Sequence, residues 1–271
     1  MLIILDNKSS IKKINKKYKF KKENKIKKYI KKDIKNMIKS PTFFIQNILQ
    51  YIFIAIFFII ILNIFFPIIV QQIDADNMIE KMGLEEFKLQ ATLISVAIIQ
   101  ILFVFSNLSI TAISREGKNA IFMKYIPISL YKQIKIKALP QIIINTIIIL
   151  AIIIDVYFQQ INIPFIYLLS VFITSMLINI INSYLLVLVD LNKPNLNWTN
   201  QESITKNSGN KLYQYVMTIF IFLILNYLLK IFKDNNYLFS MIIINLLFLI
   251  ILILLKIFIK KNQNKIFKNI Y

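Results

Sequence analysis

Residues 42–70 read TFFIQNILQYIFIAIFFIIILNIFFPIIV and contain no charged side chain. A helix of about 20 apolar residues crosses the roughly 30 Å hydrocarbon core of a bilayer, so this stretch predicts a membrane span. Pro41 directly precedes it, at a position where a helix start tolerates proline. The whole chain is 57% hydrophobic with a mean hydropathy of +0.64, and its apolar residues form long blocks. A water-soluble domain would space them at intervals.

Further apolar blocks predict five more spans, at residues 89–113, 139–158, 164–189, 212–229 and 237–259. The predicted fold class is therefore all-α, a polytopic membrane protein with six transmembrane helices. With six crossings both termini lie on one side, and that side then carries every basic residue except Lys81, Lys88, Lys230 and Lys233. Because Lys and Arg are enriched in cytoplasmic loops, we predict that both termini are cytoplasmic (N-in/C-in). The predicted location is the cell (cytoplasmic) membrane.

The chain divides into three predicted parts. Residues 1–40 form a basic cytoplasmic segment, residues 41–259 form the six-helix transmembrane domain, and residues 260–271 form a basic cytoplasmic tail. Over residues 25–40, apolar side chains recur at helical spacing between lysines, namely Ile26, Ile30, Ile34, Met37 and Ile38. This pattern predicts a basic amphipathic helix lying in the membrane interface, although a solvated run of charge is the alternative.

Composition excludes several classes of chemistry. The chain contains neither cysteine nor histidine, which removes disulfides, thiol nucleophiles, zinc sites and imidazole bases. We therefore predict no catalytic residue, no metal site and no cofactor bound by this chain. The net charge of +20 could suggest a nucleic-acid partner, but the lysines flank apolar blocks, as in membrane proteins. Membrane lipids, and not nucleic acid, are the expected partners.

Few polar side chains fall within the predicted spans. Asp155 lies near the outer end of the third span, where it either reaches the outer headgroups or has a functional role. Asparagines are interpreted as residues that pack helices together through hydrogen bonds, namely Asn63, Asn107, Asn145, Asn179, Asn182 and Asn226.

The most informative loop begins with SREGKNAIFMKYIPIS at residues 114–129 and contains Arg115, the only arginine of the chain. Ser114 could cap a helix that starts directly after it. Pro127 breaks the following apolar run, and Ser129 could cap a second helix. We expect two short amphipathic pieces at the membrane surface, which either lie passively in the headgroups or form a docking surface.

The second loop, residues 190–211, reads DLNKPNLNWTNQESITKNSGNK. Pro194 stiffens an extended segment, and Trp198, the only tryptophan, could anchor in the membrane interface. Thr199 with Glu202 fits a capping box, which predicts a short helix through residues 200–207.

Three segments resemble one known family. SREGKNAIFMKYIPIS is similar to a cytoplasmic segment of the ABC-2 type (type-2) ABC exporter permeases of bacteria. DLNKPNLNWTNQESITKN at residues 190–207 is similar to a later loop of these permeases, and KKDIKNMIKSPTFFIQNIL at residues 31–49 resembles the stretch that opens their later membrane half. The matches occur in the family's order. Family members are longer, so the chain resembles only their C-terminal membrane half.

The resemblance implies a transmembrane permease subunit, with no ATPase site of its own, that couples ATP hydrolysis by a separate ABC ATPase subunit to substrate export. It implies an ATPase-coupling loop with the residues Ser114, Arg115, Glu116, Gly117, Lys118 and Pro127. It also implies a second cytoplasmic loop with the residues Asp190, Pro194, Trp198, Glu202 and Lys206. A phosphate-binding GxxxxGK[ST] loop is missing from the sequence, which agrees with ATP being bound by the partner. A homodimer or a second permease half is expected, since two halves must meet to form a pathway.

Two other classes of function are compatible with a membrane protein of this composition. A membrane enzyme acting on lipid would need clustered carboxylates, whereas Glu116, Asp190 and Glu202 are dispersed along the sequence. The remaining alternative is a non-catalytic membrane protein, such as a degenerate or partial permease half, an immunity factor or an assembly factor. A stable complex with an ATPase would separate the permease from this alternative.

Overall fold

A computed structural model describes residues 25–72, 79, 82–159, 163–200, 203–204 and 210–266. These residues form helices and turns, and no β-strand occurs among them. Six helices are long and apolar enough to cross a membrane, at Pro41–Phe65, Leu84–Phe103, Leu130–Phe158, Phe165–Asn192, Lys211–Phe232 and Tyr237–Ile266. The predicted all-α polytopic membrane fold is therefore confirmed.

The first span is built from three helical pieces in continuous sequence. α2 (Pro41–Phe44) leads into a π-helical segment, η1 (Ile45–Leu49), and then into α3 (Gln50–Gln72). Pro41 occupies the first helical turn, as predicted. The later elements are α5 (Leu84–Phe103), the 3₁₀ segment η2 (Ser114–Lys124), α6 (Leu130–Phe158), α7 (Phe165–Asn192), α9 (Lys211–Phe232) and α10 (Tyr237–Ile266).

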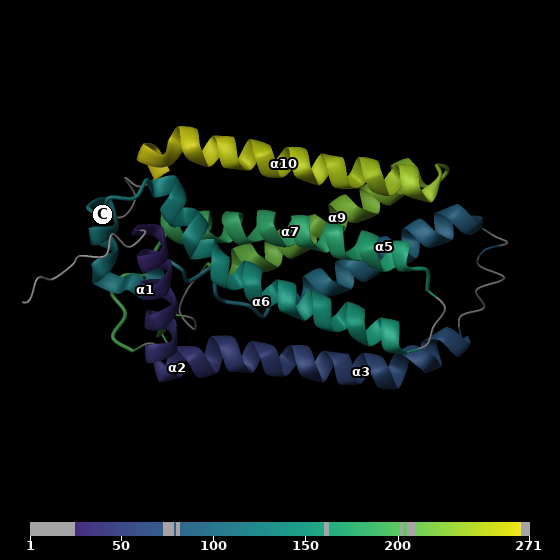
Figure 1. Cartoon of the computed structure of the whole chain (residues 1–271), viewed down its shortest axis with the longest axis horizontal. Helices are drawn as coiled ribbons and strands as arrows, with labels where there is room; N and C mark the ends of the chain where they lie inside the picture. Colours follow the sequence, from purple (N-terminus) through teal and green to yellow (C-terminus); the bar gives the residue numbers. More distant parts are fainter. Residues whose placement is uncertain are drawn as a thin grey trace, which may run out of the picture.

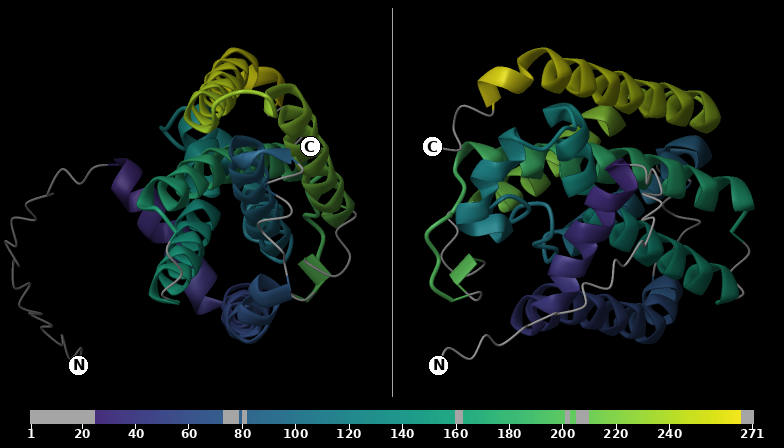
Figure 2. Two further views of the ribbon diagram at one scale, coloured as in Figure 1. Left: turned by 90° about the vertical axis from the view of Figure 1, so that its right-hand side faces the viewer. Right: turned by 60° about the vertical axis from the view of Figure 1, so that its left-hand side comes forward.

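α7 forms the centre of the bundle and packs against α5, α6, α9 and α10 (Figures 1 and 2). Over the most apolar 18 residues of α7, 61% of the residues are buried. The same stretch of the first span and of α9 is 11% buried. Small and polar buried side chains let neighbouring helices approach α7 closely, among them Ser170, Thr174, Ser175 and Ser183. The first span and α9 thus leave most of their apolar surface for lipid or for another subunit.

Buried amides connect three of the membrane-spanning helices. The Tyr51 hydroxyl donates a 2.8 Å hydrogen bond to Asn145 Oδ1, and Asn145 Nδ2 donates a 2.8 Å bond to Asn179 Oδ1. This chain of bonds joins α3, α6 and α7, so the predicted packing role is confirmed for Asn145 and Asn179. Asn226, by contrast, donates to the carbonyl of Phe222 in its own helix.

The predicted end of the second span was wrong. α5 ends at Phe103, and residues 104–113 form largely buried turns instead of continuing the helix. Gln214 of α9 donates to the carbonyl oxygens of Phe103 and Ser106, at 2.9 and 2.8 Å, and Gln141 Oε1 accepts a 2.8 Å bond from the Ser109 amide. Because these amide side chains supply partners to the backbone, the chain can leave the helix inside the protein.

α6 begins at Leu130, before the predicted start of the third span at about residue 139, so one helix runs from the loop into the span. The expected second amphipathic piece is the first part of this helix, and Pro140 lies inside the helix without ending it. Ser129 does occupy the N-cap position, but its side chain makes no capping hydrogen bond. The lysines do not interrupt the helix, since Lys135 is exposed and Lys137 is paired with carboxylates.

α1 (Lys25–Lys39) confirms the predicted N-terminal helix and lies across one end of the bundle (Figure 1). Its buried residues are Tyr29, Asp33 and Met37, which share one face. Ile34 and Ile38 lie on the exposed surface instead. The face of α1 that packs on the bundle therefore combines an acidic residue with Tyr29 and Met37, and the exposed Ile34 and Ile38 stay available for the predicted membrane interface.

Candidate functional site

The two loops singled out in the sequence meet at the end of the bundle that α1 crosses. We call this region the junction, and define it by Asp33, Ser114–Gly117, Lys137, Asp190 and Trp198. Its parts come from α1, η2, the first turns of α6, the last turns of α7 and the segment that follows α7.

Asp190 joins α7 to the start of η2. Its carboxylate is fully buried and accepts hydrogen bonds from the backbone amides of Ile113 and Ser114, at 2.6 and 2.9 Å. The Ser114 hydroxyl donates to the same carboxylate, and the Asn195 amide donates to that hydroxyl at 2.9 Å. The expectation that Ser114 caps its own helix was wrong, because this hydroxyl is directed to Asp190. Such charge-assisted bonds are the stronger class of hydrogen bond, so they hold η2 firmly on α7.

Gly117 and Trp198 form a second contact between the two loops. Gly117 has φ +54° and ψ −137°, a conformation that residues with a side chain rarely adopt. A Cβ atom at this position would lie 3.2 Å from the indole ring of Trp198. The indole nitrogen donates a 2.8 Å bond to the carbonyl oxygen of Ser114. The ring thus packs on η2, in place of the predicted anchorage in the membrane interface.

Lys137 of α6 connects α1 and η2. Its side chain is completely buried, and its ammonium group pairs with Asp33 of α1 and, at 2.5 Å, with Glu116 of η2. Arg115 NH2 lies 3.9 Å from Asp33 Oδ2, and the exposed Lys32 lies 3.7 Å from Glu116. A buried charge without a partner destabilises the folded state, so the loss of any one of these groups should destabilise the protein by leaving its partners buried and unpaired.

The pKa values of Asp33 and Glu116 follow from these ion pairs. Burial alone would raise the pKa of Asp33, but Lys137 and Arg115 outweigh it and lower this pKa below its ordinary value. The same balance holds for Glu116, where burial opposes the stronger combined effect of Lys137 and Lys32, and the pKa is lowered. Burial raises the pKa of the neighbouring Tyr29 to about 12. At neutral pH Asp33 and Glu116 are therefore ionised carboxylates, and Tyr29 is a neutral phenol.

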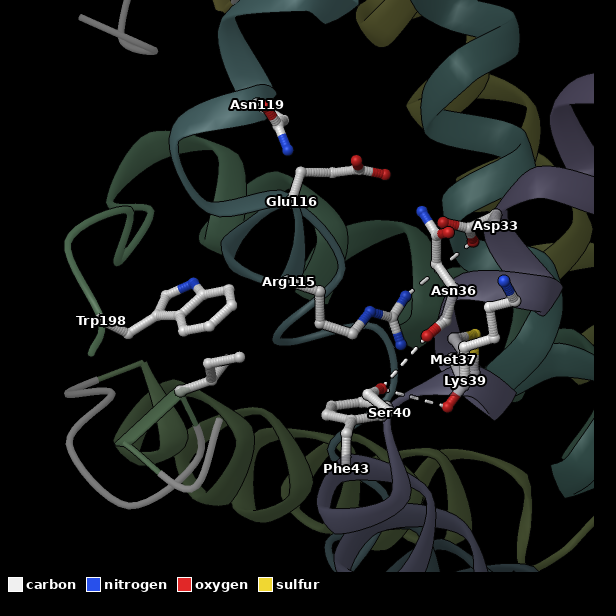
Figure 3. Close-up of a pocket in the computed structure, with 11 residues that line it drawn as sticks. Asp33, Asn36, Met37, Lys39, Ser40, Phe43, Arg115, Glu116, Asn119 and Trp198 are labelled. Carbon is white, nitrogen blue, oxygen red and sulfur yellow. Dashed lines mark hydrogen bonds and ion pairs between the residues drawn. The ribbon is translucent and has the colours of Figure 1, made fainter. Parts of the chain in front are cut away.

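A cavity of about 260 Å³ opens beside these charges (Figure 3). Arg115 and Trp198 line it from η2 and from the segment after α7, and residues in the last turns of α1 line it as well. The Arg115 guanidinium lies over the Phe43 ring, 5.0 Å from its centroid, which is a cation–π geometry.

The junction brings together most of the predicted coupling residues. Ser114, Arg115, Glu116, Gly117, Asp190 and Trp198 all contribute contacts to it. Lys118 is exposed, Pro127 is exposed in the turn before α6, and Pro194 is half-buried. Glu202 and Lys206, and with them the predicted capping box and most of the helix at residues 200–207, lie outside the described residues.

Sequence reasoning missed two members of the junction, Asp33 and Lys137. Asp33 is the only acidic residue between Lys25 and Lys39, and this isolation among lysines was a usable signal. The sequence contains no comparable signal for Lys137, because nothing distinguishes it from Lys132 and Lys135.

A second cavity, of about 280 Å³, lies between the first span and α9. Its lining is rich in amides and includes Gln46 and Asn47 of the π-helical segment, Gln50 of α3, and Lys211 and Gln214 of α9. π-Helical turns occur often at functional sites. These polar groups lie in the first turns of two helices whose remaining surface is largely apolar.

No family model, no curated protein and no solved structure matches the chain. Across the described residues, no cluster of His, Cys, Asp or Glu could hold a metal ion. The geometry that the junction does show is a set of buried ion pairs and hydrogen bonds that tie η2 to α1, α6 and α7.

Proposed function

We propose that this chain is the membrane-embedded permease subunit of an ABC exporter of the cell membrane. A separate ATPase subunit would bind ATP and dock on η2 and the turn after it. The observation that carries this proposal is the junction, in which η2 is bonded to α1, α6 and α7 at once.

The bonds of the junction suit a coupling element. A force applied to η2 would reach α7 through Asp190 and α6 through Lys137, since both side chains are buried and bonded to η2. α7 packs against four other long helices, so a displacement of its end would reach the whole bundle. A loop that lay passively in the headgroups would not need such bonds.

The outer surface of the loop suits a docking partner. Phe122 is 59% exposed and Tyr125 is 76% exposed, next to the partly exposed Ile121. Aromatic side chains of this kind are enriched at protein interfaces. These side chains belong to η2 and the turn directly after it. The proposed docking surface therefore lies next to the bonds that join η2 to Asp190 and Lys137.

The amide-lined cavity between the first span and α9 supports the transport part of the proposal. It offers polar groups to a cargo along two helices whose remaining surface is apolar. A second copy or a second permease half covering these two helices would enclose it, in keeping with the expected pairing.

The test is affinity purification of the tagged chain from its native membrane in mild detergent, with partners identified by mass spectrometry. Stoichiometric recovery of a nucleotide-binding subunit is the expected result. Phe122→Ala/Tyr125→Ala should lose that subunit, whereas Tyr157→Ala/Phe158→Ala, which removes exposed aromatics from the far end of α6, should keep it. Recovery of the chain alone, or only with itself, would favour the non-catalytic membrane protein instead.

A further inference from the structure

Arg115 has unused hydrogen-bonding capacity beside the junction cavity. Its side chain is only 9% exposed, and neither terminal guanidinium nitrogen has a hydrogen-bond partner among the described residues. The separation of 3.9 Å from Asp33 is an ion pair without a hydrogen bond. Buried donors are nearly always satisfied, so these nitrogens point to an acceptor that the described part of the chain does not supply.

The charges around the cavity select an anion as that acceptor. Asp33 and Glu116 also line the cavity, but both carboxylates are paired with Lys137, and each has a further cation within 4 Å, Arg115 for Asp33 and Lys32 for Glu116. The exposed Lys39 adds a second cation to the cavity lining, and three neutral residues add polar groups, namely Asn36, Ser40 and Asn119. Figure 3 shows Asn36 and Ser40 beside the guanidinium and Trp198 on the opposite side of the space.

The position of the cavity selects the kind of anion. Its wall includes the corner between α1 and α2, where the chain enters the first membrane-spanning helix at Pro41. α1 presents the exposed Ile34 and Ile38 close by, as expected for a helix at the membrane surface. The cavity therefore lies at the level of the lipid headgroups. Phosphate is the anion that headgroups present, and guanidinium binds it through paired hydrogen bonds.

We propose that the cavity between α1 and η2 binds the phosphate group of an anionic lipid, held by Arg115 and Lys39. The site does not depend on the proposed export function. A bound headgroup would bridge α1 and η2, so that the lipid would become part of the junction.

Trp198 reports on this site directly, because it lines the cavity and is the only tryptophan of the chain. The purified full-length protein in neutral detergent is titrated with short-chain phosphatidic acid while Trp198 emission is recorded. We expect a saturable change with phosphatidic acid and a much weaker one with zwitterionic phosphatidylcholine. Inorganic phosphate is a separate arm, and equal affinity for it would replace the lipid by free phosphate and so overturn the lipid assignment.

Matched variants separate a site from general surface charge. Arg115→Gln/Lys39→Gln should weaken phosphatidic acid binding by at least about tenfold, as expected for lost charge-assisted bonds. Lys35→Gln/Lys135→Gln removes the same charge from exposed positions of α1 and α6 and should bind like the wild type. If the first pair does not fold, Arg115→Lys, which keeps the charge but loses the paired donors, should still bind several-fold more weakly. Absence of saturation in the wild type, or equal weakening in both pairs, overturns the proposal.

Discussion

Asp190 and Asp155 are carboxylates near opposite ends of two neighbouring helices, and their surroundings differ. Asp190 is fully buried at the end of α7 and accepts bonds from two backbone amides and a hydroxyl of another segment. Asp155 is half-buried in α6, and among the described residues it accepts side-chain bonds from the amides of Asn63 and Gln159, at 2.9 and 3.0 Å. The first carboxylate determines the path of a loop, whereas the second merely links two helices at the surface.

The buried charges of this membrane protein are concentrated at the junction, and the opposite end has a carboxylate that is only partly buried. At the junction, buried charges hold together four segments that are far apart in the sequence. At the other end, Asp155 has the partly exposed position that the headgroup interpretation anticipated. We therefore expect substitutions at the junction to cost more than equivalent substitutions at the opposite end.

The largest effect is expected for Lys137→Met, because it leaves Asp33 and Glu116 buried without their shared cation. The free energy of unfolding should fall by about 3–5 kcal/mol, measured by titration with sodium dodecyl sulfate in mixed micelles. Lys135→Met, in the exposed position two residues earlier, is the control and should change stability by less than about 0.5 kcal/mol. Equal effects of the two would show that the junction pairing does not stabilise the fold.

Asp190→Ala and Asp155→Ala together test whether the two carboxylates contribute differently to the free energy of unfolding. Asp190→Ala leaves the amides of Ile113 and Ser114 without their acceptor, and each such buried group costs about 1–3 kcal/mol. We expect a loss near 3 kcal/mol in the same titration. Asp155→Ala should cost about 0.6 kcal/mol, as is typical of hydrogen bonds between membrane helices. A larger loss for Asp155→Ala than for Asp190→Ala would reverse the assignment of roles.

Gly117→Ala and Gly83→Ala form a matched pair at the two ends of the bundle. Both glycines have positive φ, +54° and +85°, so both variants experience backbone strain of about 1 kcal/mol. Only at Gly117 does the new methyl group also meet the Trp198 ring, since nothing lies within 4 Å at Gly83. Gly117→Ala should therefore destabilise more and also shift Trp198 fluorescence. An unchanged emission spectrum would place Trp198 away from η2.

The smallest effect concerns pH. The pKa values of Asp33 and Glu116 are lowered in the folded protein, so their stabilising contribution is complete above the ordinary carboxyl pKa of about 4. That contribution should be lost as pH falls through the lowered folded-state values. In Lys137→Met this lysine no longer offsets the rise that burial causes in the pKa values of Asp33 and Glu116. Acidification to about pH 4 should therefore reduce the difference in unfolding free energy between the variant and the wild type. A difference that grows on acidification would contradict the pairing.

The six spans could be predicted because length and hydropathy alone determine which segments can cross a bilayer. The buried turns at residues 104–113 could not, since this segment is as apolar as a helix and its amide partners come from Gln141 and Gln214. An apolar block ended early because side chains distant in the sequence satisfied its backbone. Hydropathy contains no information about such partners.

The candidate site could be predicted in part. Arg115, Gly117 and Trp198 were conspicuous because each is a rare residue type in this chain, and the structure places them in contact or close proximity. The resemblance named both loops, but nothing in it indicated that Asp190 bonds the start of η2. Asp33 and Lys137 were hidden by the abundance of lysine, because a buried pair is recognised only after its two helices are packed together.

The central claim is that η2 transmits the action of an ATPase to the helices, and the measurement is ATP hydrolysis by the purified complex. Arg115→Ala/Glu116→Ala removes one charge of each sign from η2, and Glu85→Ala/Lys88→Ala removes an ion pair of 2.7 Å from α5 as a charge-matched control. We expect that the η2 variant still assembles but loses stimulation of ATP hydrolysis by the membrane subunit, while the α5 variant keeps it. Normal stimulation in the assembled η2 variant would contradict the account.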